Sequence, residues 1–472
     1  MITLQRNLLT LGLRNDLATF IHRTFQTIAP GQQFLMNWHI QALAWHLEQC
    51  AKGNIKRLLI TLPPRHLKSI SASVAFPAWA MGCDPTKRII CASYSAELAN
   101  KHARDCRSVM DSSWFRQAFA ETVLSREKNA EMDFMTTRGG YRYSTSTGGT
   151  LTGRGGNLII IDDPIKAEDA LSEARRTAVN EWFSSTAYSR LDSKRDDVII
   201  LIMQRLHLDD LAGYVMKSEP WVHLNLPAIA EVEERIQIGA TEYHLRRVGD
   251  VLHEARENRA DLDEIKARMG SFNFSAQFQQ RPIPLKGEIV RWEWFQFYDQ
   301  VPPRGPRDQV VLSVDTASKE GEINDYSVCT SWLVKGNERY LLGLARDRVN
   351  YPDLKRLVID QAVRFRVSTI IIEDAGSGTA LSQELAREGY SGVPKPSAIR
   401  PDGSKVTRMS TASAQIESRQ VFLPRSADFL EDLRLELLQF PYGRHDDQAD
   451  SISQFLNWIG QRNRHRTIIR GW

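Results

Sequence analysis

The sequence is poor in cysteine, and its few cysteines form no recognisable pattern. Only five occur among 472 residues, without a CxxC pair or any metal-ligand spacing. This excludes a disulfide scaffold and a cysteine-ligated zinc site, and indicates free thiols in a reducing compartment. The cysteines are Cys50, Cys83, Cys91, Cys106 and Cys329.

Long apolar runs are also missing. No stretch approaches the roughly 18 apolar residues of a membrane span, and the first twenty residues mix Arg, Asn and Asp with apolar residues. We therefore expect neither a membrane segment nor a signal peptide. Hydrophobic residues make up 42% and charged residues 25% of the chain, as in globular proteins. The net charge of +4 permits nucleic-acid binding without requiring it.

The first half of the chain predicts an α/β domain. Residues 16–25 and 37–49 have apolar residues at helical spacing, and we expect two helices within residues 1–50. Short, nearly continuous apolar runs follow, which are typical of strands in a parallel sheet covered on both faces. These runs are residues 57–62, 88–94, 157–163 and 197–204. Residues 231–280 are charged and predict helix.

The second half predicts another α/β domain, in the order β-β-β-α-β-α followed by final helices. This is the order of a ribonuclease-H-like sheet, in which the first and fourth strands are neighbours. We expect the following parts: a helical region at 1–50, an α/β domain with a parallel sheet at 51–255, a linker at 256–306, a ribonuclease-H-like domain at 307–460 and a basic tail at 461–472. The linker should pack Trp292, Trp294 and Phe295 against one domain.

The segment "LPPRHLKSIS" follows the first predicted strand and precedes a predicted helix. A phosphate-binding loop reads GxxxxGK[ST], in which backbone amides hold phosphates, the Lys reaches the β and γ phosphates and the hydroxyl contacts Mg²⁺. Leu62 and Leu67 stand at the two glycine positions. The alternative is a solvated turn. The predicted nucleotide-binding residues of the loop are Pro64, Arg65, His66, Leu67, Lys68 and Ser69.

The segment "NLIIIDDP" supports the nucleotide-site interpretation. An apolar strand that ends in two carboxylates fits a Walker B motif. We expect Asp162 to hold the Mg²⁺ shell and Asp163 to polarise the attacking water. Taken alone, the segment could be a strand followed by a turn, but the two motifs occur in order on one predicted sheet. Residues 51–255 are therefore predicted to form a P-loop ATPase domain of ASCE type.

Three further residues are candidates for the nucleotide site. Arg154 lies in the Gly-rich segment 148–156 and could reach a γ-phosphate, its own or a neighbouring subunit's. A flexible hairpin with a solvated arginine is the alternative. Gln204 and Arg205 lie at the C-terminal end of the strand at 197–204, where open parallel sheets bind ligands. A salt bridge at a helix start is the alternative.

Acidic residues of the second domain predict a metal-dependent nuclease. Asp315 lies within an apolar strand, an expensive position for a lone charge, and Glu373 ends the fourth strand. Clustered carboxylates repel unless cations neutralise them, and two Mg²⁺ or Mn²⁺ ions would do so and activate water against a phosphodiester. The individual alternatives are helix caps and strand-end salt bridges. The predicted ligands are Asp315, Glu373, Asp374, Asp446, Asp447 and Asp450.

Together these motifs resemble the large subunit of tailed-bacteriophage terminases. The resemblance runs from about residue 35 to 455 and rests on "PPRHLKS", "GGTLTGRGGNLIIIDDPIK", "FSAQFQQRPIPLKGEIV", "SVDTASK", "IIIEDAGSG" and "HDDQADS". These proteins are viral DNA-packaging motors with an ATPase and a nuclease domain. The family commonly has Gly where Leu67 stands and often Glu where Asp163 stands.

The resemblance implies roles and partners. By resemblance, Lys68, Ser69, Asp162 and Asp163 carry ATP hydrolysis, and Asp315, Glu373 and Asp446 carry DNA cleavage. The implied cofactors are ATP and Mg²⁺, with Mn²⁺ able to substitute. The implied partners are double-stranded DNA, a portal protein, a small terminase subunit and further copies in a ring. The implied location is the cytoplasm of the infected or lysogenic bacterium, outside the mature virion.

Two other interpretations stay open. One is a helicase-like translocase with a resolvase-type nuclease domain, although no further helicase motif follows residue 204. The other is an inactive prophage relic, which Leu62 and Leu67 favour and the complete acidic set opposes. The arginines of the basic tail predict docking on a portal or on DNA, with a solvated end as the alternative. They are Arg462, Arg464, Arg466 and Arg470.

Overall fold

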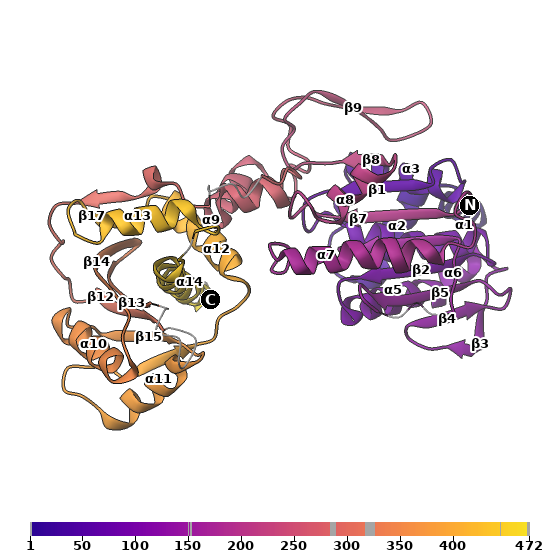
Figure 1. The fold of residues 1–472 in the computed structure, drawn as a ribbon. Coiled ribbons are helices and arrows are strands. Elements are labelled where there is room, and N and C mark those ends of the chain that lie inside the picture. The colour runs from indigo at the N-terminus through magenta and orange to yellow at the C-terminus, as the bar shows by residue number, and fades with distance from the viewer. Residues whose placement is uncertain are drawn as a thin grey trace. The chain divides into compact units, whose positions relative to one another are not determined.

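The computed structural model of the chain forms two compact units (Figure 1). It describes residues 2–149, 151, 153–283, 289–316, 326–443 and 445–469, and the side chains of 2–7, 127–129 and 463–469 are not described. Unit 1 is Met1–Asp263 with Asn273–Pro284, and unit 2 is Glu264–Phe272 with Leu285–Trp472. None of the described helices has the length and apolar composition that crossing a membrane requires.

Unit 1 is built on an eight-stranded sheet of order β3-β4-β5-β2-β6-β7-β1-β8. Its central strands are parallel: β2 pairs with β5 and β6, and β7 pairs with β6 and β1. The strands of the sheet are β1 (Arg57–Thr61), β2 (Arg88–Ser93), β3 (Leu124–Asn129), β4 (Asp133–Thr136), β5 (Tyr141–Ser146), β6 (Leu158–Asp162), β7 (Val198–Met203) and β8 (Val222–Asn225).

Helices cover both faces of this sheet. Alternate residues of each central strand, such as Leu58 and Leu59 of β1, enter two different apolar clusters, as expected for a parallel sheet buried on both sides. The helices are α1 (Ile2–Asn15), α2 (Leu17–Ile28), α3 (Trp38–Ala51), α4 (Phe76–Cys83), α5 (Ala96–Asp111), α6 (Ser113–Ala118), α7 (Glu173–Glu181) and α8 (Leu211–Ser218), with a π-helix at Ile70–Ala75 and irregular turns at Trp182–Arg190.

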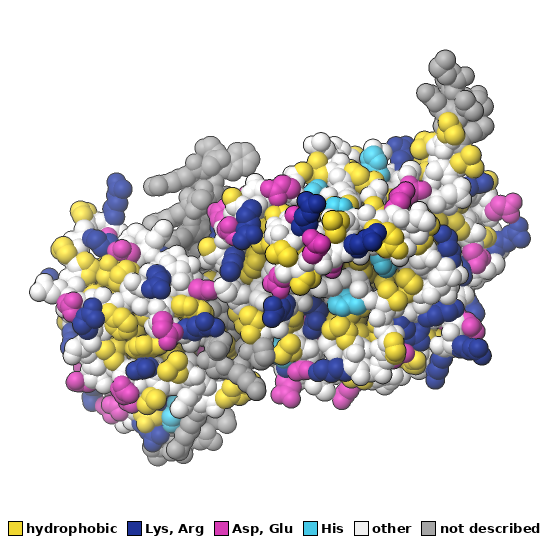
Figure 2. All heavy atoms as spheres, turned by 90° about the horizontal axis from the view of Figure 1, so that it is seen from above, with side chains coloured by type: hydrophobic (Ala, Val, Ile, Leu, Met, Phe, Trp, Pro, Cys, Tyr) yellow, Lys and Arg dark blue, Asp and Glu magenta, His cyan; other side chains and the backbone are white. Residues whose placement is uncertain are grey.

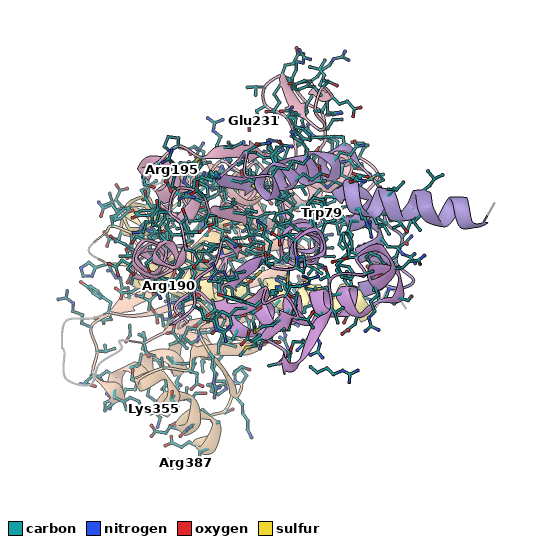
Figure 3. All side chains as sticks on the ribbon, turned by 90° about the vertical axis from the view of Figure 1, so that its right-hand side faces the viewer. Trp79, Arg190, Arg195, Glu231, Lys355 and Arg387 are labelled. Atoms are coloured by element: carbon teal, nitrogen blue, oxygen red, sulfur yellow. The ribbon has the colours of Figure 1, made fainter. Side chains whose placement is uncertain are left out.

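The N-terminal region contains a helix that the sequence analysis did not anticipate. The two expected helices are α2 and α3, and α1 precedes them. Figure 3 shows α1 projecting from unit 1 with Trp79 near its base, and Trp79 Nε1 donates to the Leu13 carbonyl at 3.2 Å. Leu13 is buried, whereas Leu8 and Leu9 are at least half exposed, which explains the weak helical periodicity of this segment.

The prediction of helix is wrong for residues 231–258. They contain a two-stranded antiparallel hairpin, β9 (Glu234–Gln237) and β10 (Tyr243–Arg246). The hairpin packs through Trp38, whose ring stacks on His244 at 4.2 Å and lies below the Arg246 guanidinium. Helix does follow, as α9 (Arg259–Gln277), which is interrupted at Gly270, where φ is 79°.

Unit 2 is built on a seven-stranded sheet of order β11-β17-β14-β13-β12-β15-β16. The first and fourth strands of the expected series, β12 and β15, are parallel neighbours. The strands are β11 (Gln296–Tyr298), β12 (Gln309–Asp315), β13 (Ser327–Lys335), β14 (Glu338–Asp347), β15 (Thr369–Glu373), β16 (Pro396–Ile399) and β17 (Val421–Pro424). The helices are α10 (Tyr351–Arg364), α11 (Ser377–Glu388), α12 (Lys405–Glu417), α13 (Leu430–Gln439) and α14 (Asp447–Ile469), with a short turn at Trp292–Trp294.

The two faces of this sheet are covered by different helices. Val311 and Ile371 join the core with α12, α13 and α14, while Val310 and Ile370 join the core with α10 and α11. The aromatic residues expected in the linker belong to the first of these cores: Phe295 is buried in it, and Trp292 and Trp294 pack against it.

The expected basic tail continues α14 as far as Ile469. Arg462 lies over the Trp458 ring at 4.6 Å. The side chains of Arg464 and Arg466 and the whole of Arg470 lie outside the described residues, as do 284–288 of the expected linker. Both α/β folds follow the predicted fold class.

Candidate functional site

The first candidate site lies at the carboxyl ends of β1 and β6. β7 separates these two strands in the sheet, as expected of an ASCE-type ATPase. Lys68 and Ser69 open the helical segment after the loop, and Asp162 ends β6. The fold therefore places the loop beside the two carboxylates, as the sequence predicts.

The loop achieves its turn without glycine. Arg65 and Leu67 have φ values of 66° and 63°, in the left-handed region that costs a non-glycine residue roughly 1–2 kcal/mol. Leu62 has no such conformation and is fully buried in the unit 1 core. Thus only the second of the two glycine positions requires glycine-like geometry here.

The loop side chains engage the two carboxylates directly. Lys68 Nζ lies 2.9 Å from Asp163 Oδ2, and the Ser69 hydroxyl donates to Asp162 Oδ1 at 3.2 Å. Burial raises the pKa of both aspartates, and the Lys68 ammonium opposes this rise. The backbone N–H of Gln204 donates to Asp163 Oδ1 at 3.3 Å, which brings the Gln204 backbone into the site.

Asp162 also has two buried polar neighbours that the sequence does not predict. The Ser73 hydroxyl donates to Asp162 Oδ2 at 2.7 Å, and His102 Nδ1 lies 3.6 Å from the same oxygen. Ser73 belongs to the π-helix, a rare element that is frequent at functional sites. Burial, followed by the charge of Arg142, lowers the pKa of His102 to about 4, so its ring is neutral. No sequence signal marks Ser73 or His102 as partners of Asp162.

Arg205 does not join this site. Its Nε lies 3.1 and 3.0 Å from the two carboxylate oxygens of Asp210, and its Nη2 donates to the carbonyl of His207 at 3.2 Å. Asp210 is the N-cap of α8. The prediction that Arg205 contacts nucleotide is therefore replaced by a structural role at a helix start, because a buried carboxylate five residues away takes its charge.

Arg154 makes its contacts with residues other than Lys68 and Asp163. Its guanidinium pairs with the two oxygens of Asp133 on β4, with Nη1 to Oδ1 at 3.0 Å, and lies 4.6 Å from the centre of the Tyr143 ring. β4 lies several strands away from β1 in the sheet. A role of Arg154 in its own nucleotide site would need that ion pair to break.

A cavity opens beside the loop. Its lining combines loop side chains with aromatic, imidazole and guanidinium groups from elsewhere in unit 1. The Nε2 atoms of His39 and His253 are buried without a hydrogen-bond partner in the part of the chain that the structure describes. Burial lowers the pKa of His66 to about 4. The main lining residues are Phe34, His39, Arg65, His66, His253 and Arg256.

The second candidate site lies on the face of the unit 2 sheet that α14 covers. Asp315 and Glu373 follow the paired residues Val314 and Ile372 of β12 and β15, so the strand neighbours bring them together. Burial raises the pKa of Asp315 well above its ordinary value, and the carboxylates of Asp450 and Glu373 raise it further. This mutual repulsion marks a convergent acid cluster.

Two basic residues of α12 neutralise this cluster. Lys405 Nζ lies 2.8 Å from Asp446 Oδ1 and 2.7 Å from Asp450 Oδ2. Arg408 Nη2 lies 3.0 Å from Asp450 Oδ1 and 3.8 Å from Glu373 Oε2. Burial disfavours the Lys405 ammonium, but its bonds to Asp446 and Asp450 outweigh this and raise its pKa. Neither residue stands out in the sequence, because α12 has no acidic or glycine-rich motif.

The remaining acidic candidates occupy different positions. Asp447 Oδ2 lies 3.6 Å from Arg346 Nη2 at the edge of the cluster. Asp374 is not part of the cluster, contrary to its prediction as a ligand: it accepts from the Thr379 hydroxyl at 2.9 Å and pairs with Arg400 at 3.4 Å. Consecutive strand residues point to opposite faces, so Glu373 and Asp374 cannot both face α14.

A buried hydroxyl network fixes α14 beneath the acids. The Ser451 hydroxyl bonds Thr330 Oγ1 at 2.8 Å and the Ser313 carbonyl at 3.2 Å, and Gln454 Nε2 donates to Ser313 Oγ at 3.0 Å. Ser313 is two residues before Asp315, and Ser451 follows Asp450. The network therefore sets the position of one acid relative to another.

The acids suit a divalent cation by chemistry but do not form a preassembled coordination sphere. Carboxylate oxygens are the hard donors that Mg²⁺ and Mn²⁺ prefer. Burial and the neighbouring carboxylates of Asp450 and Glu373 raise the pKa of Asp315, and the Lys405 ammonium opposes this rise. Among the described residues, however, no three His, Cys, Asp or Glu side chains are grouped as around a bound metal. The fit is one of donor type and charge, with Asp315, Glu373 and Asp450 as the convergent donors.

Comparisons with known proteins give matches to both units of the chain. Residues 312–458 match the family model of the terminase RNaseH-like domain. A crystal structure of the large terminase from a thermophilic bacteriophage matches with a TM-score of 0.54 at 11% identity, over 90% of this chain and 99% of that one. The chain has the fold of a phage large terminase. The resemblance that the motifs indicate is confirmed at this level.

Two further structures of the same thermophilic-phage large terminase give the same result. The complex with ADP matches at 12% identity with a TM-score of 0.53, and the complex with ATP-gamma-S at 11% identity with a TM-score of 0.52. Each match covers 89% of this chain and 98% of the other chain. No curated protein gives a significant match. At such identities the large-terminase likeness establishes the fold and leaves the activities of this chain to be proposed.

Proposed function

We propose that this chain is the large subunit of a viral terminase, which uses ATP hydrolysis to move double-stranded DNA into a procapsid and cuts the DNA with a metal-dependent nuclease. The observation that carries the proposal is that one chain contains two separate clusters of acidic side chains. One is Asp162 and Asp163 beside Lys68, and the other is Asp315 with Glu373 and Asp450.

The nucleotide site supports ATP hydrolysis through Lys68, Ser69 and the two aspartates. Lys68 pairs with Asp163 at 2.9 Å and would transfer to the β and γ phosphates when ATP binds, which frees Asp163 to polarise water. Ser69 and Asp162 would share the Mg²⁺ that accompanies ATP.

Arg154 is proposed to complete the site of a neighbouring copy in a ring. Its side chain is about one-third exposed and pairs with Asp133, so assembly would exchange that partner for a phosphate. Mixing Arg154→Ala with Lys68→Ala subunits should restore part of the ATPase activity, whereas no rescue in co-assembled mixtures contradicts an action between subunits.

The nuclease site supports phosphodiester hydrolysis through its carboxylates. Asp315, Glu373 and Asp450 would hold the metal ions, with Asp446 and Asp447 at the margin. Bound Mg²⁺ or Mn²⁺ would supply charge neutralisation and an activated water. The chain's own contribution is to keep these acids on one face, through the β12–β15 pairing and the buried contacts of Ser451.

The proposed partners follow from the proposed function in DNA packaging. Figure 2 shows Lys and Arg side chains dispersed over the visible face among acidic and apolar ones, which suits local contacts to the DNA backbone that ignore sequence. A portal protein, a small terminase subunit and further copies of this chain are the remaining proposed partners, and the bacterial cytoplasm is the proposed location.

The experiment measures DNA-stimulated ATP hydrolysis and Mn²⁺-dependent plasmid cutting in parallel. We expect Lys68→Ala to abolish hydrolysis and leave cutting largely intact, because the two sites belong to different units. Absence of both activities in the unmodified chain would favour an inactive relic. Strand separation coupled to hydrolysis would favour a helicase-like translocase.

A further inference from the structure

Beside the acid cluster of unit 2 lies a group of cationic and aromatic side chains. Asp315 of β12 pairs with Val328 of β13, and Val328 pairs with Arg346 of β14. Directly paired residues share a face of a sheet, and neighbouring strands lie about 4.8 Å apart. Arg346 therefore stands on the same face as Asp315, about 10 Å away by this strand spacing.

Tyr326 organises two arginines at this place. The guanidinium carbon of Arg346 lies 3.9 Å, and that of Arg348 4.4 Å, from the centre of the Tyr326 ring. Both distances are well within the range of a cation–π interaction. The His445 ring meets the same tyrosine edge-on at 5.4 Å.

The two arginines differ in how their charge is used. Arg346 Nη2 lies between Glu436 Oε2 at 3.5 Å and Asp447 Oδ2 at 3.6 Å, so neighbouring acids neutralise it. Arg348 is exposed, and its guanidinium forms no ion pair with any described residue. Its backbone N–H donates to Asp347 Oδ1 at 2.8 Å. An arginine oriented by a ring keeps its charge and its donors available for a ligand.

We propose that Arg348, oriented by Tyr326, binds a backbone phosphate of the DNA strand next to the phosphodiester that the acid cluster cleaves. This inference rests on the proposed nuclease function. A guanidinium binds a phosphate through two parallel hydrogen bonds, and such a contact is independent of sequence. It also offsets the repulsion that the carboxylates exert on the incoming strand. Arg346 acts as a positioning residue: it stacks on the Tyr326 ring and is itself held by Glu436 and Asp447.

The test is DNA affinity as a function of salt, measured with the full chain. Fluorescence anisotropy of a labelled duplex in EDTA gives Kd without cleavage, over about 50–200 mM salt. The variants are Arg348→Ala, Arg348→Lys and Tyr326→Leu. Arg387→Ala is the matched control, since Arg387 projects from α11 into solvent and is 78% exposed (Figure 3).

We expect Arg348→Ala to raise Kd about three- to tenfold and to reduce the slope of log K against log salt by roughly 0.9, as for one lost phosphate contact. Arg348→Lys should recover the slope but only part of the affinity, and Tyr326→Leu should weaken binding while leaving the slope nearly unchanged. In Mn²⁺ the Arg348→Ala loss should appear in KM, with kcat within about twofold of the parent.

An Arg348→Ala protein with the Kd and slope of Arg387→Ala would overturn the inference. So would a fall in kcat with unchanged Kd, which would make Arg348 part of the chemistry. A parent chain that binds DNA but never cuts it contradicts the proposed nuclease function instead, and the Kd comparison still decides the phosphate contact.

Discussion

Replacing Leu67 by glycine tests how a phosphate loop works without its usual glycine. The left-handed conformation of Leu67, with φ of 63°, costs about 1–2 kcal/mol for a side chain with a Cβ. Glycine would remove this strain. Against that stand the lost packing of a partly buried leucine against the unit 1 core, about 1 kcal/mol, and the greater chain entropy of glycine, about 0.5–1 kcal/mol.

These terms nearly cancel, so Leu67→Gly should change the unfolding free energy by less than about 1 kcal/mol. The melting temperature should then shift by less than about 4 °C. ATP affinity should stay the same or increase, because a flexible glycine lets the backbone approach the phosphates closely. Differential scanning fluorimetry and titration with a fluorescent ATP analogue measure the two quantities.

Leu62→Gly is the matched control at the other glycine position. Leu62 is fully buried and has no left-handed conformation, so the change removes core packing worth at least about 2 kcal/mol without relieving strain. Its melting temperature should fall by at least about 4 °C. A tenfold weaker ATP affinity in Leu67→Gly, about 1.4 kcal/mol, would contradict this expectation and show that the leucine side chain shapes the nucleotide site.

Two further predictions concern stability. Ser451→Ala should lower the unfolding free energy of unit 2 by about 1–3 kcal/mol and reduce kcat for Mn²⁺-dependent cutting, because it removes the buried hydroxyl bonds to Thr330 and Ser313. Thr411→Ala removes an exposed hydroxyl on α12 and should change neither quantity. Equal melting temperatures for the two variants would contradict the role of the buried hydroxyl network. Burial lowers the pKa of His66 to about 4. Between that value and its unfolded pKa near 6.5, the unfolded chain binds more protons than the folded chain. The stabilisation that is present above pH 6.5 is therefore lost towards pH 4, at up to about 1.4 kcal/mol per pH unit. His66→Asn should flatten this loss in melting curves at about pH 7.5, 6.5 and 5.5, which span the unfolded pKa, and an unchanged pH profile would contradict it.

The sequence predicts what depends on local pattern and sheet order. Continuous apolar runs identify β1, β2, β6 and β7 almost to the residue, because strands buried on both faces tolerate little else. The convergence of Asp315 and Glu373 follows from the neighbouring β12 and β15. Both results depend on backbone topology.

The ion-pair partners of the basic side chains could not be predicted from the sequence. Arg205 finds Asp210, Arg154 finds Asp133, and Lys405 reaches Asp450. Each arginine or lysine could pair with several acids, and only the folded geometry determines which acids it contacts. The β9–β10 hairpin escaped detection because its short strands are charged and half exposed, which leaves no apolar periodicity to detect.

The proposed nuclease site is tested most directly by digestion of plasmid DNA in Mn²⁺ with the full chain and with Asp315→Ala. Asp299→Ala serves as a control, since Asp299 is exposed, pairs with Arg425 and takes no part in the acid cluster. We expect nicked and linear plasmid with the parent and the control, and intact plasmid with Asp315→Ala, whose ATP hydrolysis stays at the parent rate. Cutting by Asp315→Ala at the parent rate would contradict the proposed nuclease site.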